Sequence, residues 1–153
     1  MKRLLVLPVL LLTLLVGMPA FSADEKSSLE YAKLGHKLFS VIECSVYSEH
    51  IEDENERQRL HNLGISIGRE FITAANDGKI EKKDWSNNVP TVFGLMRGGP
   101  SIDFVLGRWW EFILGHTFDK IEKKCGSDGC SSKDVKGVWA GNLYSDKNCK
   151  LIQ

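Results

Sequence analysis

The four cysteines of this 153-residue chain limit its possible folds more than any other feature. They are Cys44, Cys125, Cys130 and Cys149. An even number of cysteines in a small exported domain predicts two disulfides. Pairing Cys44 with Cys125 and Cys130 with Cys149 would tie an early helix to a late one. Pairing Cys125 with Cys130 and Cys44 with Cys149 would instead pin the tail to the early helix. Four cysteines allow three pairings, and the sequence does not choose among them.

The first 22 residues have the three-part layout of a secretory signal peptide. A basic start at residues 1–3 precedes an apolar run over residues 4–16, and Ala20-Phe21-Ser22 supplies the small residues of a cleavage site. The apolar run is 13 residues long, whereas a helix needs about 20 to cross a bilayer. We therefore predict a signal peptide at 1–22 and a mature protein in the periplasm or secreted. The alternative is an uncleaved N-terminal membrane anchor.

Basic and acidic residues balance, with 20 Lys and Arg against 20 Asp and Glu. A nucleic-acid binder needs an excess of basic residues to neutralise phosphates, so we expect no nucleic-acid partner. The sequence holds no motif typical of a catalytic metal, a phosphate-binding loop or a haem attachment site. Cys125 and Cys130 are also spaced more widely than zinc ligands usually are. We therefore expect no cofactor and no metal.

Helix start and stop signals predict an all-α protein. We expect a small four-helix domain over residues 23–125 and a disulfide-stapled, mostly irregular tail over 126–153. Ser27 and Glu30 form a capping box before a helix over about 28–51. The second helix begins after Asp53 and stops at Asn76-Asp77-Gly78.

Two prolines predict the remaining helices, because proline is tolerated in the first turn of a helix. Pro90 starts a short third helix, and Pro100 starts a fourth that runs to about residue 124. Residues 79–88 are polar and predict a connector or a single turn. The tail has room for a short hairpin.

The fourth helix carries large apolar residues on two sides. One arc is an ordinary core face, made of Ile102, Val105, Leu106, Trp109, Ile113 and Thr117. The opposite arc mixes polar residues with Phe104, Leu114 and Phe118. We expect this to be the central helix, covered on both sides, and the alternative is an apolar patch shown to a partner. Arg108 and Glu111 are three apart and are expected to pair with each other.

His36, Glu43 and His50 share one stripe of the first predicted helix, because they are spaced by seven. Seven residues rise about 10.5 Å, which is too far for these groups to hold one metal ion. We predict a solvated face, and the alternative is a partner surface.

The sequence favours binding over catalysis. The layout of signal peptide, helical core and two disulfides is similar to that of small periplasmic immunity proteins, which block cell-wall amidases delivered by type VI secretion. We therefore expect a protein-binding module that acts as an inhibitor or as an immunity-type protein. A homodimer is a further alternative. Aromatic residues and arginine are the usual anchors of protein interfaces. The candidate partner-binding residues are Arg97, Phe104, Arg108, Trp110, Glu111, Phe118, Trp139 and Tyr144.

Two alternative functions remain open. Glu43 on a helix together with Gly94-Leu95-Met96 resembles lytic transglycosylases, which use one helix-borne glutamate as general acid. Cys44 stands where that family has serine, and Arg97 where it has glutamine. This resemblance implies a peptidoglycan-active glycan hydrolase or lyase using Glu43. The other alternative is a membrane-surface protein with residues 89–114 lying in the interface.

Overall fold

The computed structural model describes residues 25–126, 130 and 132–153, and this part of the chain contains helices and no strand. The all-α prediction is therefore confirmed. The predicted signal peptide at 1–22 lies outside the described residues. The elements are α1 (Ser28–His50), α2 (Glu54–Asn76), α3 (Lys82–Asn88), α4 (Thr91–Leu95), α5 (Ile102–Lys124), α6 (Lys133–Asp146) and a 3-10 turn, η1 (Cys149–Leu151).

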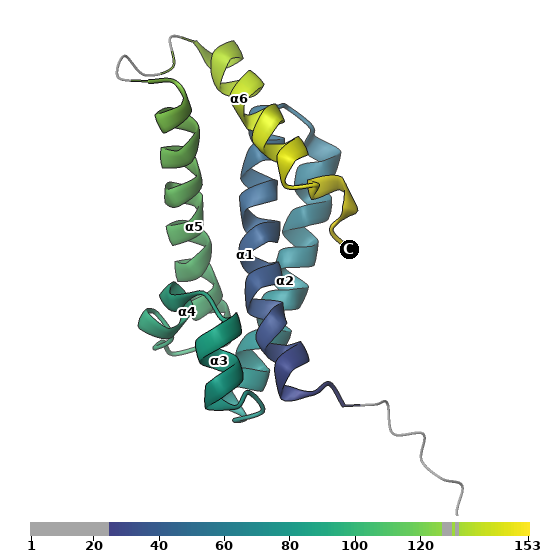
Figure 1. The fold of residues 1–153 in the computed structure, drawn as a ribbon, viewed down its shortest axis with the longest axis vertical. Helices are drawn as coiled ribbons and strands as arrows, with labels where there is room; N and C mark the ends of the chain where they lie inside the picture. The colour runs from purple at the N-terminus through teal and green to yellow at the C-terminus, as the bar shows by residue number, and fades with distance from the viewer. Residues whose placement is uncertain (1–24, 127–129, 131) are drawn as a thin grey trace, which may run out of the picture.

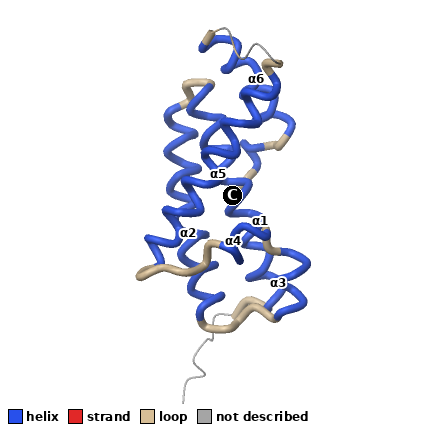
Figure 2. The backbone as a smooth tube through the Cα atoms, turned by 90° about the vertical axis from the view of Figure 1, so that its left-hand side faces the viewer, coloured by secondary structure: helices blue, strands red, loops and turns tan. Residues whose placement is uncertain are grey.

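The helices surround α1. The hairpin partner α2 lies along one side of α1, and α5 lies along another (Figure 1). In the same view α6 crosses the upper end of the α1–α2 hairpin, while α3 and α4 lie near its lower end. Figure 2, turned by 90°, shows helix throughout, joined by short loops. Within the described ranges, no helix is both long enough and apolar enough to cross a membrane.

Side-chain caps explain where the long helices begin. Ser27 accepts a hydrogen bond from the Glu30 backbone, and the Glu30 carboxylate reaches back to the Ser27 backbone, so the predicted capping box is present. Asp53 caps α2 in the same way, and Ser101 caps α5. These contacts span three residues, which is why the sequence could predict them.

The central helix is α1, so the expectation that the fourth predicted helix is central is wrong. Every residue from Val41 to Ser48 is buried, which means that α1 is covered all round over two turns. On α5 the buried residues instead lie on one side: Val105, Trp109, Ile113, Thr117 and Ile121 form a stripe that steps by four, and Leu106 lies beside it. α1 and α2 both pack on that side, while α4 lies beside the lower end of α5 in Figure 1.

The tail is helical, so the prediction of a mostly irregular tail or a hairpin is wrong. Residues 133–146 form α6, which packs on α1. Its glycines, which disfavour a helix in isolation, allow this close approach. A Cβ on Gly137 would lie 3.1 Å from the His50 carbonyl oxygen, and one on Gly141 would lie 3.5 Å from Ile51. The predicted connector at 79–88 likewise contains α3.

Aromatic side chains fill the core between α1, α2, α4 and α5. Phe93 of α4 stacks on Trp109 of α5 with ring centroids 4.2 Å apart, and Phe71 of α2 lies 5.8 Å from Trp109. Two glycines let α2 and α5 meet. A Cβ on Gly68 would lie 2.5 Å from Leu106, and one on Gly64 would lie 2.9 Å from the Trp110 ring.

Candidate functional site

The side of α5 opposite its buried stripe faces away from α1 and α2, and the loop before α5 packs against its first turn, where a Cβ on Gly99 would lie 2.6 Å from the Phe104 ring. Phe104 keeps 48% of its surface exposed and Phe112 keeps 44%. We call this surface the outer face of α5, and it consists of Phe104, Gly107, Arg108, Glu111, Phe112 and Gly115, all of which are exposed. Half-exposed phenylalanines on a helix that is otherwise well packed mark a surface suited to contact.

The charged residues of the outer face do not pair with each other. Arg108 donates from Nη1 to the Gly98 carbonyl oxygen at 2.8 Å, and its guanidinium lies 5.9 Å from the centre of the Phe104 ring. No ion pair to Glu111 occurs among the residues that the structure describes. The expected pairing of Arg108 with Glu111 is therefore wrong, because the loop before α5 offers the guanidinium a backbone acceptor.

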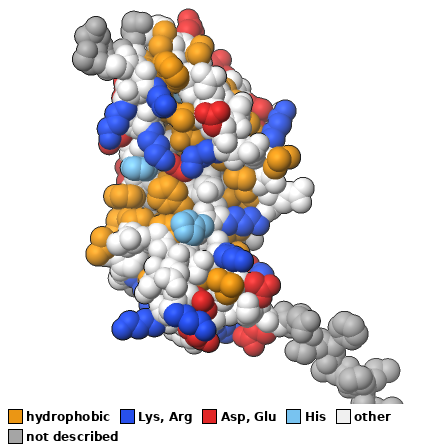
Figure 3. All heavy atoms as spheres, in the orientation of Figure 1, with side chains coloured by type: hydrophobic (Ala, Val, Ile, Leu, Met, Phe, Trp, Pro, Cys, Tyr) orange, Lys and Arg blue, Asp and Glu red, His pale blue; other side chains and the backbone are white. Residues whose placement is uncertain are grey.

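An apolar patch adjoins the outer face on the side toward α1. Phe112 stacks on His116 with ring planes 7° apart, and His116 meets Phe39 of α1 edge-on at 6.0 Å. Figure 3 shows hydrophobic side chains gathered at mid-height over α5 and the adjoining part of α1, with histidines beside them. The exposed aromatic surface thus continues from α5 onto α1.

The structure distributes the eight predicted partner-binding residues over several surfaces. Phe104, Arg108 and Glu111 share the outer face of α5. Trp110 turns toward α2, where its ring lies 4.7 Å from His61. Phe118 is half-buried and lies 5.1 Å from His50.

The other three predicted residues lie away from α5's outer face. Arg97 donates to the Ala75 carbonyl oxygen at 2.5 Å and lies over the Trp85 ring. Trp139 is half-buried against the core. Tyr144 is buried and donates to Glu56 at 2.6 Å. The outer face also includes Gly107, Phe112 and Gly115, which are not among the predicted partner-binding residues. Helical spacing could have identified two of them, because Phe112 follows Phe104 by eight residues and Gly115 follows Glu111 by four.

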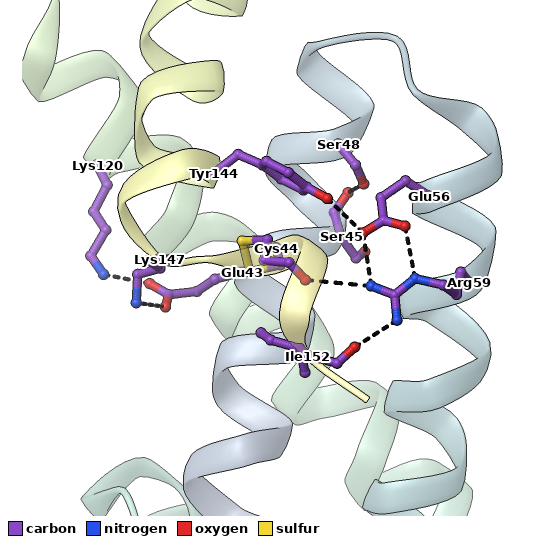
Figure 4. The surroundings of a disulfide bond; sticks show 11 residues. Glu43, Cys44, Ser45, Ser48, Glu56, Arg59, Lys120, Tyr144, Lys147 and Ile152 are labelled. Carbon is purple, nitrogen blue, oxygen red and sulfur yellow. Dashed lines mark hydrogen bonds and ion pairs between the residues drawn. A yellow bond between two sulfur atoms is a disulfide. The ribbon is translucent and has the colours of Figure 1, made fainter.

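Glu43 is buried in the centre of the molecule. Its side chain has no exposed surface, and its two carboxylate oxygens are bound by lysine ammonium groups from two other segments. Lys120 of α5 binds one oxygen, and Lys147, directly after α6, binds the other at 2.5 Å (Figure 4). The prediction that Glu43 lies on a solvated face is therefore wrong. The two lysines make the burial tolerable, because they neutralise the carboxylate where water is excluded.

The two histidines of the predicted solvated stripe differ in how exposed they are. His36 is exposed as predicted, whereas His50 is half-buried. Tyr47, four residues after Glu43 on α1, is fully buried. Burial, together with the charge of Glu43, raises the pKa of the Tyr47 hydroxyl. The buried Nε2 of His50 has no hydrogen-bond partner among the described residues, and burial lowers the pKa of its imidazole.

The tail is fastened to the α1–α2 hairpin by a disulfide and by hydrogen bonds. The disulfides are Cys44–Cys149, with Cα atoms 5.6 Å apart, and Cys125–Cys130, at 4.9 Å. The pairing that pins the tail to the early helix is the one observed. Arg59 of α2 donates to the carbonyl oxygens of Ile152 (2.6 Å) and Cys149 (3.4 Å), and it also binds Glu56 (Figure 4).

The structure gives little support to Glu43 as a general acid or to a metal site at Cys125 and Cys130. A general acid must touch its substrate, and the Glu43 carboxylate is enclosed and bound at both oxygens. Among the described residues, ligand atoms of Glu122, Cys125 and Cys130 lie within 4.8 Å of one another. The two sulfur atoms are bonded to each other, so they are not the thiolates that zinc requires. The apolar face of residues 102–114 is likewise used in the core.

The fold and its surface define a small all-helical, disulfide-linked protein with one long helix exposed along its outer side. No family model matches the chain. Comparisons with curated proteins and with solved structures likewise give no match. The two disulfides are compatible with an exported protein in an oxidising compartment.

Proposed function

We propose that this chain is an exported, periplasmic or secreted, protein-binding module that acts by stoichiometric contact, as an inhibitor or immunity-type protein does. The outer face of α5 is its contact surface. The observation that carries the proposal is the pair of phenylalanines, 48% and 44% exposed, on the side of α5 away from α1 and α2. Burying such rings against another polypeptide would remove apolar surface from water, which is the main driving force of association.

The composition of the outer face supports the same function. Aromatic residues and arginine are enriched at protein interfaces, and Phe104, Arg108 and Phe112 supply both. The surface is borne on a helix with a fully packed inner side, so little ordering is needed on binding. Export is supported by the pattern of residues 1–22 and by the pairing of all four cysteines.

Site-specific photo-crosslinking tests the proposal. A photo-reactive side chain placed at position 112 should give a crosslink to a polypeptide in the compartment where the protein resides. The same group at position 151 is the matched control, because Leu151 is an exposed apolar residue (76%) on η1, outside the outer face. Introducing Phe104→Asp should abolish the crosslink at 112. A chain that crosslinks to no polypeptide at either 104 or 112 would contradict the proposal.

A further inference from the structure

The outer face of α5 is complementary to itself. We infer that the polypeptide it binds is a second copy of this chain, with the two α5 helices antiparallel across a two-fold axis. This inference rests on the proposed function, because it requires the outer face to be a protein-binding surface. It goes further by naming the occupant and the register of the contact.

The positions along α5 carry the inference. The midpoint between Arg108 and Glu111 is also the midpoint between Phe104 and Gly115. In an antiparallel pair with the two-fold axis at that point, Phe104 stands level with Gly115 of the second copy, and Arg108 with Glu111 of the second copy. At 100° per residue, Phe104 and Gly115 are only about 20° apart around the helix, and Arg108 and Glu111 about 60° apart. Both pairs therefore meet along one seam.

Size complementarity operates at the ends of this seam. Phe104 is a large ring that is half exposed, and Gly115 is an exposed glycine in the middle of a helix. Apart from its neighbours in α5, a Cβ on Gly115 would have no atom of the described residues within 4 Å, so packing within one molecule does not require glycine there. Glycine inside a helix is less stable than alanine would be, because glycine loses more conformational freedom on folding. Glycine at this position would let a phenylalanine ring of a second copy pack directly on the helix backbone.

Charge complementarity operates at the centre of the seam. Arg108 and Glu111 are both exposed, carry opposite charges and are not paired with each other. Arg108 uses Nη1 for the Gly98 carbonyl oxygen, which leaves its other donors for a carboxylate. The two-fold axis makes each Arg108 face one Glu111, so the ion pair forms twice. Phe112 then lies beside the aliphatic stem of Arg108 of the second copy, which such a ring can cover.

The place of α5 in the fold leaves room for this approach. Above α4, α5 runs along one edge of the molecule in Figure 1, with α1, α2 and α6 all on its other side. The seam spans residues 104–115, about 17 Å of helix, which is a small interface. We therefore expect a reversible dimer whose dissociation constant lies in the micromolar range.

Charge reversal tests the register. Sedimentation velocity of the exported protein with intact disulfides, from about 1 µM to about 500 µM, should show a monomer–dimer equilibrium. Arg108→Glu and Glu111→Arg should each weaken the dimer at least about tenfold, because each reversal acts twice in a symmetric pair. An equimolar mixture of the two variants, or the double variant carrying both reversals, should regain dimerisation, because opposite charges then face each other again.

Two further variants guard against effects on folding. Gly115→Leu should abolish dimerisation without lowering the stability of the monomer, because leucine favours the helix and has free space in one molecule. Lys33→Glu on α1 is the matched control for charge reversal and should leave the dimer unchanged.

A protein that stays monomeric over this range, or a dimer that Arg108→Glu does not weaken, would overturn the inference. If the crosslink at position 112 then joins a different protein, the proposed function stands and the second copy is the wrong occupant. If position 112 crosslinks to nothing, both fail.

Discussion

α1 and α5 are matched in length and in the way they begin, yet they occupy different places in the fold. Each has 23 residues, starts after a serine cap and has a similar average hydrophobicity. α1 is buried all round over residues 41–48, in its C-terminal half, and includes Glu43, Ser45 and Ser48 among its buried residues. α5 is buried on one side and exposes two phenylalanines on the other.

The difference shows what decides which helix is central. A helix can be buried all round when other helices surround it and provide partners for its polar side chains. Glu43 can be buried because Lys120 and Lys147 reach it from other elements, and Ser48 donates to the Ser45 carbonyl oxygen at 2.8 Å. α5 has no helix beyond its outer face in the described chain, so its phenylalanines stay at the surface. The neighbours of each helix thus explain why Glu43 of α1 is buried and why two phenylalanines of α5 are exposed.

The largest predicted effect compares the disulfide in the C-terminal half of α1 with the one at the end of α5. Replacing Cys44 and Cys149 together by serine should lower the free energy of unfolding by about 4–5 kcal/mol, since that bridge closes a loop of 105 residues. The Cys125–Cys130 disulfide closes a separation of only 5 residues. Replacing both of these cysteines by serine should therefore lower the free energy of unfolding by about 2 kcal/mol. Urea unfolding without reductant, followed by circular dichroism, measures both. Equal losses would show that the tail is not fastened to α1 in this way.

The next effect compares a glutamate on each helix. Glu43→Ala should lower the free energy of unfolding by about 1–3 kcal/mol, because two lysines lose their partner beside a buried site, although they are partly exposed and regain some hydration. Glu111→Ala on the outer face should change stability by less than about 0.5 kcal/mol. Urea unfolding at low protein concentration, where self-association does not contribute, gives both values. Glu43→Gln should lie between them, and a neutral Glu43→Ala would contradict the role of the buried carboxylate.

The smallest effect is a pH dependence at the end of α1. Burial lowers the pKa of His50 in the folded protein below its ordinary value of 6.5. The unfolded chain therefore takes up this proton first as pH falls, so the stability that neutral His50 provides is present above 6.5 and is lost progressively below it. Between about pH 7.5 and about pH 5.5, His50→Gln should lose less stability than the unmodified protein. His36→Gln is the control, because His36 is exposed on the same helix. The opposite order of losses would show that the imidazole is not held neutral.

Sequence reasoning predicted the features that depend on nearby residues. The capping box of Ser27 and Glu30, the stop at Asn76–Asp77–Gly78 and the core face of Trp109 and Ile113 all follow from contacts or repeats within a few positions. It could not predict that Glu43 is buried, because its lysine partners lie 77 and 104 residues away. It also missed α6, because Gly137 disfavours a helix until His50 lies against it.

The candidate surface was predicted in part for the same reason. Phe104, Arg108 and Glu111 were expected to bind a partner, and they do share one exposed face. Trp110 has the same chemistry, but α2 presents Gly64 and His61 to it, so its ring is used inside the molecule. Residue type identified candidates, whereas the position of the neighbouring helix decided which of them remained exposed.

The sequence by itself determined that this protein is helical, where its long helices begin, and that its cysteines form two bridges, since these properties depend on local hydrogen bonding, apolar period and the number of thiols. Only the tertiary structure decided that Cys44 joins Cys149, that α1 is the central helix, and that α5 turns two phenylalanines outward. These outcomes depend on contacts between segments far apart along the chain, whose free energies exist only once the helices have packed.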